Sequence, residues 1–134
     1  MSTPSPTAPS PGPVVVYIGI AWSLLPDSFT PERKRDIQAG VERAMSELRG
    51  LGYDATWCGV GMDPEAAVLQ VRQTLQARPA ACVLLGAGLR KTDEALILFE
   101  RILNEVHTSC PRAALCFNSV PGDSAAAVKR WVSP

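Results

Sequence analysis

The sequence has few of the residues and patterns that mark several common classes of protein. Among its 134 residues there is a single histidine, and thirteen lysines and arginines are balanced by thirteen acids. The formal charge is therefore zero, and no basic run is longer than residues 33–35. Such a chain lacks the positive surface that binding to a phosphate backbone requires, so we expect no nucleic-acid partner.

Long apolar segments are also missing. The longest one spans residues 14–25 and is interrupted by Gly19 and Ser23, whereas a membrane helix needs about 20 apolar residues. Residues 1–13 contain five prolines and neither lysine nor arginine, unlike the basic start of a secretory signal peptide. We therefore expect a cytoplasmic protein with no membrane segment.

The cysteines do not form a metal-binding or redox motif. The chain has four of them without a Cys-x-x-Cys pair, and one histidine leaves few partners for a zinc site, so we expect no metal. Free thiols buried in the core are the simplest expectation. A redox pair of Cys110 and Cys116 is the alternative, and it depends on whether the two sulfurs meet in the fold.

After residue 13 the chain alternates four times between strand and helix. Residues 1–13 have too few apolar side chains to offset the entropy of ordering them, which predicts a disordered Pro/Ser/Thr-rich tail before one domain of residues 14–134. Strands are predicted at about residues 14–22, 53–60, 81–85 and 113–118. Helices are predicted to begin near Thr30, Asp63, Thr92 and Asp123.

This alternation predicts a small doubly wound α/β sandwich of three layers. Helix-length crossovers favour parallel strands with right-handed connections and helices on both faces. We expect four mainly parallel strands in the order 2-1-3-4 and about four helices, with the polar Asp54 and Thr56 marking the second strand as an edge. The plan resembles that of flavodoxin-like and Rossmann-like domains over residues 14–132, and a resemblance in plan implies no particular function.

The loop after the third strand carries the strongest signal for a ligand. In open parallel sheets, ligands bind at the carboxyl ends of the strands where the strand order reverses, here between the first and third strands. Gly86 and Gly88 would let the backbone approach a ligand, and Arg90 and Lys91 would bind a phosphate or carboxylate beside the N-terminus of the next helix. The alternative is a tight turn with two solvated cations, partly balanced by the acids that follow.

Two further loops contribute to this candidate site. Trp22 and Phe29 would cover an apolar ligand body beside Ser23, although covering the open end of the core explains them as well. Asn118 and Ser119 would orient the ligand by hydrogen bonds, the alternative being turn formation before the last helix. No P-loop, complete dinucleotide fingerprint or Gly-x-Ser-x-Gly elbow is present, so the sequence assigns neither a cofactor nor a reaction.

Two functions are therefore consistent with the sequence. The first is a small-molecule-binding α/β domain, with or without catalysis, that holds an anion at the third strand-to-helix loop. The second is a non-catalytic interaction or self-assembly module, in which an edge strand or the third helix meets a partner or a second copy. The third helix supports the second function because it is more apolar than one sheet face requires. Its apolar residues are Leu96, Ile97, Leu98, Phe99, Ile102 and Leu103.

Overall fold

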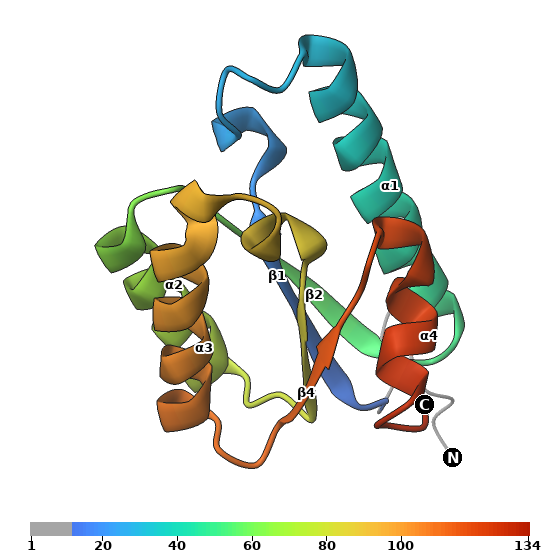
Figure 1. Cartoon of the computed structure of the whole chain (residues 1–134). Coiled ribbons are helices and arrows are strands. Elements are labelled where there is room, and N and C mark those ends of the chain that lie inside the picture. Colours follow the sequence, from blue (N-terminus) through green and yellow to red (C-terminus); the bar gives the residue numbers. More distant parts are fainter. Residues whose placement is uncertain (1–11) are drawn as a thin grey trace, which may run out of the picture.

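A parallel sheet forms the middle layer of the computed structural model, which describes residues 12–134 (Figure 1). Nearly all of the predicted tail lies outside the described residues. Within them the sheet has the strand order β2-β1-β3-β4, and every neighbouring pair is parallel. The strands are β1 (Val14–Ile20), β2 (Asp54–Val60), β3 (Cys82–Leu85) and β4 (Ala114–Phe117). The predicted sheet and its strand order are confirmed.

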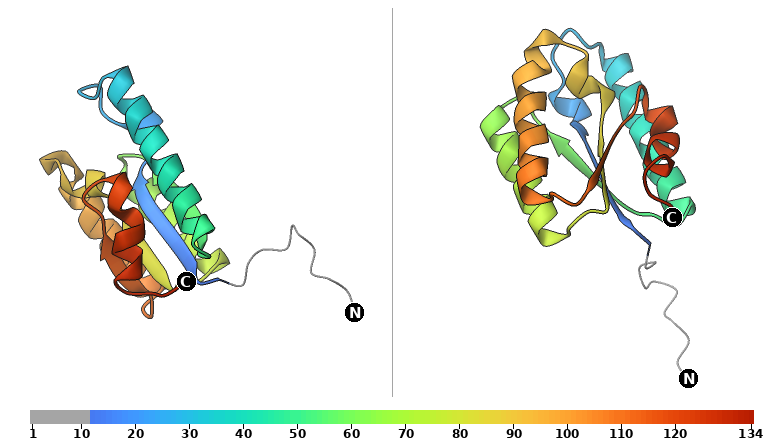
Figure 2. Two further views of the ribbon diagram at one scale, coloured as in Figure 1. Left: turned by 90° about the vertical axis from the view of Figure 1, so that its right-hand side faces the viewer. Right: turned by 60° about the horizontal axis from the view of Figure 1, so that its bottom comes forward.

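Helices cover both faces of this sheet, as expected for a doubly wound α/β fold (Figure 2). In the described part of the chain they are α1 (Pro31–Gly50), α2 (Pro64–Ala77), α3 (Leu96–Ser109) and α4 (Ser124–Lys129). Side chains alternate between the two faces of a strand, so β1 contributes to both cores. Val16 and Ile18 pack in the core beneath α2 and α3, whereas Val15 and Tyr17 pack in the core beneath α1 and α4.

The ends of α1 follow the sequence signals closely. Thr30 Oγ1 accepts a hydrogen bond of 3.1 Å from the Arg33 N–H, and proline occupies the first helical position, where its missing N–H costs nothing. The chain leaves the helix through Gly52, which has a φ of 105° that L-residues with side chains rarely adopt. Asp63 occupies the equivalent N-cap position before α2 but makes no side-chain capping bond.

The third helix begins later than predicted. Residues 87–90 and 93–95 form two short 3₁₀ turns, η2 (Ala87–Arg90) and η3 (Asp93–Ala95), and α3 starts only at Leu96. Thr92 does act as a cap, but for η3, since its Oγ1 accepts from the Ala95 N–H at 3.3 Å. Because these turns lie between Gly86 and Leu96, α3 does not follow Gly86 directly, and its contribution to an anion site there stays a prediction.

None of the helices within residues 12–134 combines the length and the apolar character needed to cross a membrane.

Candidate functional site

A cavity of about 140 Å³ lies at the carboxyl ends of β1 and β3, where the strand order reverses. Its walls come from β1, the first turns of α1, the loop before α1, and η2. Most of the lining is apolar, with Leu25 and Phe29 from the loop before α1 and Ile37 and Val41 from α1 itself. The cavity occupies the position where a parallel open sheet is expected to bind a ligand.

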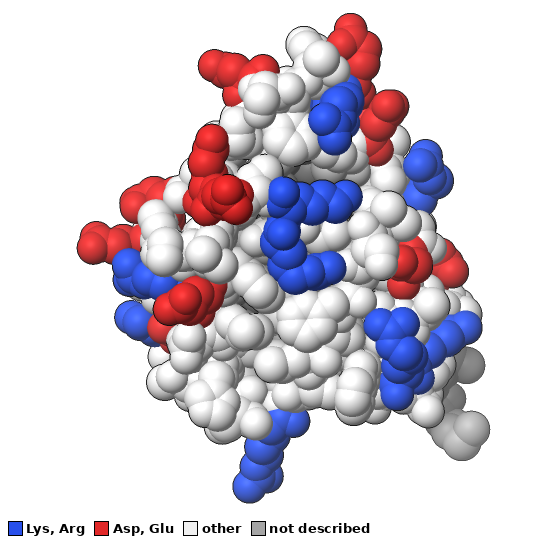
Figure 3. All heavy atoms as spheres, in the orientation of Figure 1, with Lys and Arg blue, Asp and Glu red and all other residues white. Residues whose placement is uncertain are grey.

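Two cations line the cavity, and none of its described lining residues is acidic. Arg33 comes from the first turn of α1 and Lys91 from the end of η2. The guanidinium of Arg33 lies over the ring of Phe29, 4.7 Å from its centroid. Among residues 12–134 neither cation forms an ion pair. Figure 3 shows lysine and arginine side chains beside a hollow at the centre of this face, with acidic side chains mostly at its margins.

Arg90 has a different role from the one expected of it. Its Nη1 donates a hydrogen bond of 3.0 Å to the carbonyl oxygen of Leu85, and its Nη2 donates to the carbonyl oxygen of Asn118. The guanidinium also stacks over Phe117, 5.3 Å from the ring centroid. Arg90 therefore ties the loop after β3 to the end of β4, and its donors are turned toward the backbone.

Asn118 is a buried link between three elements. Its side-chain amide donates to Tyr17 Oη at 2.9 Å and to Ser124 Oγ at 3.0 Å, while Oδ1 accepts from the Ala87 N–H at 2.9 Å. Asn118 is only 2% exposed, although it belongs to the cavity wall. Burial raises the pKa of Tyr17, so this phenol stays neutral and hydrogen-bonded at the floor of the cavity.

Ser119 lies outside the cavity, on the exposed turn before α4. Its backbone N–H donates to the carboxylate of Asp123 at 3.0 Å, and the Val120 N–H donates to the same carboxylate at 3.3 Å. Asp123 therefore closes the preceding turn and makes no side-chain cap on α4. The helix itself begins one residue later, at Ser124.

Trp22 and Ser23 belong to the 3₁₀ turn η1 (Trp22–Leu24), which does not line the cavity. The indole of Trp22 stacks on that of Trp57, with ring centroids 6.0 Å apart and planes inclined by 21°. Trp22 lines a separate groove beside Met45 and Arg49, and Ser23 is exposed. Of the aromatic side chains expected over the ligand, the structure places Phe29 in the cavity wall and Trp22 elsewhere.

Of the residues that the sequence singles out, the structure brings Gly86, Gly88, Lys91 and Asn118 together in one cavity wall. It also adds residues that the sequence does not single out, chiefly Arg33, Tyr17 and Trp57. The ring of Trp57 packs so tightly over Gly19 that a Cβ there would come within 2.8 Å of it. The length of α1 could have pointed to Arg33. The 20 residues of α1 span about 30 Å, whereas the seven of β1 span about 23 Å, so the first turn of α1 extends past the end of β1.

The four cysteines are free and buried. The pair that comes into contact is Cys82 and Cys116, with sulfur atoms 3.1 Å apart. The alternative pair of Cys110 and Cys116 is wrong, because Cys110 packs in the core on the opposite side of the sheet. Its thiol donates instead to the carbonyl oxygen of Ala80 at 3.4 Å.

Residues 12–134 contain no cluster of three or more His, Cys, Asp or Glu side chains suited to a metal ion.

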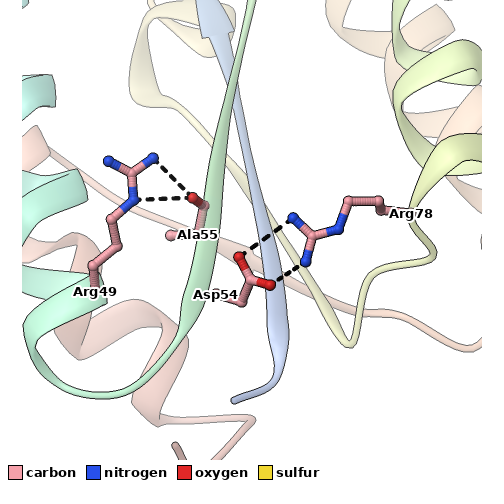
Figure 4. A network of polar contacts seen from close by, with 4 residues as sticks. All are labelled: Arg49, Asp54, Ala55 and Arg78. Atoms are coloured by element: carbon pink, nitrogen blue, oxygen red, sulfur yellow. Dashed lines mark hydrogen bonds and ion pairs between the residues drawn. The ribbon is translucent and has the colours of Figure 1, made fainter. Parts of the chain in front are cut away.

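Polar side chains occupy parts of both sheet edges. The backbone N–H and C=O groups of Asp54 and Val60 point toward β1. Backbone groups alternate in direction along a strand, so those of the odd-numbered residues between them point away from β1, at the open edge of the sheet. Arg49 donates two hydrogen bonds, of 3.2 and 3.0 Å, to the outward carbonyl oxygen of Ala55 (Figure 4). Gln70 donates to that of Gly59 at 2.8 Å. On the other edge Arg130 donates to the carbonyl oxygen of Phe117 at 3.2 Å.

The residue types in the lining limit the interactions that the cavity offers. Its described lining contains no histidine, cysteine or carboxylate, which are the groups that most often move protons or attack substrates. What it offers is an apolar enclosure with ammonium and guanidinium groups in its wall. Comparisons of the chain with protein-family models, with curated proteins and with solved structures give no significant match.

Proposed function

We propose that this protein binds a small organic anion, with a ring-sized apolar body inside the cavity and a carboxylate held by Lys91 and Arg33. The observation that carries the proposal is the lining itself, which is apolar except for a few polar groups and includes two cations but no acidic residue. Ligand sites commonly combine an apolar enclosure with a few charged or polar groups that fix orientation.

The volume limits the size of the ligand. An engineered apolar cavity of about 150 Å³ is known to hold a benzene molecule. The cavity here, at about 140 Å³, is therefore suited to one six-membered ring or a short branched chain. A nucleotide or a dinucleotide is several times larger, so we propose a monocyclic or short-chain carboxylate as the ligand class.

The charges favour an anion over a neutral molecule of the same shape. Because Arg33 and Lys91 have no carboxylate partner among the described residues, an anionic group would gain a charge-assisted interaction without displacing an existing ion pair. Each such interaction at a partly exposed site is worth about 1 kcal/mol or less. The carboxylate should therefore improve affinity several-fold, while burial of the ring supplies most of the binding energy.

Arg90 and Asn118 support the site without contributing free donors to the ligand. Both hold the loop after β3 through hydrogen bonds to backbone groups of residues 85–87 and 118. Their role is to fix the wall formed by Gly86 and Gly88 before a ligand arrives, which lowers the ordering cost of binding.

The experiment is a set of thermal melts with benzoate, benzamide, acetate and inorganic phosphate as probes. A ligand at a hundred times its Kd adds about 2.7 kcal/mol, which raises the Tm of a chain of this size by roughly ten degrees. We expect benzoate to raise the Tm most, because it supplies both the ring and the charge. Equal shifts with benzamide, or a larger shift with phosphate, would contradict the proposed ligand class.

The variant to compare is Arg33→Gln with Lys91→Gln, and its matched control is Arg43→Gln with Lys129→Gln. Both pairs remove one arginine and one lysine, but Arg43 and Lys129 do not line the cavity. The cavity variant should lose only the part of the benzoate shift that separates benzoate from benzamide and should keep its unliganded Tm, whereas the control should keep the full benzoate shift. A full benzoate shift in the cavity variant would rule out these two cations as the anion site.

Self-assembly remains a second proposal, supported by the start of α3. Leu96 and Ile97 are 58% and 55% exposed, which leaves apolar surface for another chain. The edge strands support assembly less, because side chains already bind carbonyl oxygens on both edges. Sedimentation at several concentrations tests the proposal, and a Leu96→Lys variant should weaken any association seen.

The cytoplasmic location stays a prediction from composition, to be checked by imaging a tagged chain.

A further inference from the structure

Cys82 and Cys116 lie diagonally across the paired strands β3 and β4, with Cys82 opposite Ala114 and Cys116 opposite Leu84. They are 34 residues apart in sequence, and their Sγ atoms are 3.1 Å apart. Cys82 begins β3, and Cys116 lies in β4, which pairs with β3 in parallel. Their exposed fractions are 0% and 1%. Since an S–S bond measures about 2 Å, the folded chain holds these thiols within roughly 1 Å of bonding distance.

We propose that Cys82 and Cys116 form a reversible disulfide, with a low-molecular-weight disulfide such as oxidised glutathione as the oxidant. One cysteine thiolate attacks the glutathione disulfide, forms a mixed disulfide and releases one glutathione thiolate. The second cysteine then loses its proton, attacks the protein sulfur of the mixed disulfide and releases the second glutathione. Two protein thiols are oxidised, one glutathione disulfide is reduced, and the new bond joins β3 to β4.

The sheet excludes the competing pairs that cross it. Cys82 and Cys116 pack in the core beneath α1 and α4, whereas Cys58 and Cys110 pack in the core beneath α2 and α3. Each of the latter two thiols has a partner of its own: Cys58 Sγ lies 3.7 Å from Thr74 Oγ1, and Cys110 Sγ donates to the Ala80 carbonyl oxygen. A disulfide formed in the native fold should therefore join Cys82 to Cys116.

Burial decides when the bond can form. Contact with Cys82, together with burial, raises the pKa of the Cys116 thiol, so its reactive thiolate is scarce while the fold is closed. Tyr53 packs in the same core and donates to the Val132 carbonyl oxygen at 2.6 Å, which fastens the C-terminal segment nearby. Exchange should therefore be slow in the folded protein and fast while the chain refolds.

The test is to unfold and reduce the full chain, refold it in a reduced and oxidised glutathione buffer, trap free thiols, and map the disulfides by mass spectrometry. We expect the peptide that links Cys82 to Cys116, with both Cys58 and Cys110 trapped as free thiols. A different pair, or glutathione adducts without an internal disulfide, would overturn the proposal.

Two variants keep the result independent of folding defects. The Cys58→Ala and Cys110→Ala double variant should still form the internal disulfide, while Cys116→Ala should form none. The oxidised chain should melt roughly ten degrees above the reduced chain, because the bond closes a loop of more than thirty residues. An oxidised chain that melts below the reduced one would show that the bond strains the sheet, contrary to the proposal.

Discussion

The side chain of Asn118 accepts a hydrogen bond from the backbone N–H of Ala87 at 2.9 Å, and this bond joins the end of β4 to the loop that follows β3. The two residues are 31 positions apart in the chain, and both line the cavity. The same amide group also binds Tyr17 and Ser124, so one buried side chain holds the loop, the central strand and the last helix together. The shape of the cavity therefore depends on a residue that has no free amide proton for a ligand.

Replacement of Asn118 should destabilise the protein strongly. Asn118→Ala leaves the Ala87 N–H, the Tyr17 hydroxyl and the Ser124 hydroxyl without this partner in a buried site. Because each buried group left unpaired costs about 1–3 kcal/mol, we expect a loss of about 3 kcal/mol in the free energy of unfolding, measured in urea. Ser119→Ala, on the exposed turn, should stay within about 0.5 kcal/mol of the native chain. Native stability in Asn118→Ala would disprove the linking role.

Arg90 and Lys91 should differ in what their replacement changes. Arg90→Ala removes hydrogen bonds to three backbone carbonyl oxygens and a ring contact, so we expect about 1–2 kcal/mol less stability. Lys91→Ala removes an exposed side chain and should leave stability unchanged while weakening benzoate binding several-fold. Urea unfolding and benzoate titration of both variants check this, and equal stability losses in the two would contradict the assignment.

Acid should weaken the contact between α2 and α3. Arg72 donates two hydrogen bonds to the Glu105 carboxylate and holds its pKa below the usual range, with a further bond from Ser109. A folded-state pKa below the unfolded one adds stability that is present above the unfolded pKa, near 4.3, and is lost as the pH falls through the folded pKa.

The stability difference between the native chain and Glu105→Gln should therefore shrink as the pH is lowered from about 6 to about 3. Urea unfolding of both chains at several pH values measures it. A difference that does not change with pH would mean that the Glu105 charge contributes nothing to the fold.

The side chains on the outer edge of β2 should limit association between molecules. Arg49→Ala combined with Gln70→Ala frees the outward carbonyl oxygens of Ala55 and Gly59, which can then accept hydrogen bonds from another chain. We expect this double variant to associate at lower concentration than the native chain in sedimentation velocity experiments.

The matched control is Arg43→Ala with Gln73→Ala, which removes the same two residue types from exposed positions of α1 and α2. The control should sediment like the native chain. If both double variants associate equally, loss of charge is the cause, and edge protection by Arg49 and Gln70 is refuted.

The sheet could be predicted from the sequence because its signals are local. The β-branched run at residues 14–18, the cap at Thr30 and the exit through Gly52 each depend on a few neighbouring residues, and the structure contains all three. The strand order was predicted by placing the long apolar first and third strands at the centre of the sheet and the polar second strand at an edge. The start of α3 was placed too early because Thr92 caps the 3₁₀ turn η3, and α3 follows that turn.

The candidate site was predicted only in part, because contacts with residues far away in the sequence decide which way its side chains point. Arg90 and Lys91 are adjacent and look equivalent in the sequence, yet the carbonyl oxygen of Asn118 attracts one guanidinium while the lysine stays at the cavity. Arg33 was missed because it lines the cavity only as a result of the first turn of α1 extending past the carboxyl end of β1. The Cys82–Cys116 contact depends on strand pairing, which spacing along the chain does not reveal.

The most direct test of the central claim is an NMR titration of the ¹⁵N-labelled protein with benzoate and, separately, with benzamide. Benzoate should cause saturable shifts of the Gly19, Gly86 and Gly88 amide signals, because all three glycines line the cavity. Benzamide should shift the same signals with several-fold lower affinity. Shifts confined to other residues, or equal affinities for the two probes, would contradict an anion site between β1 and β3.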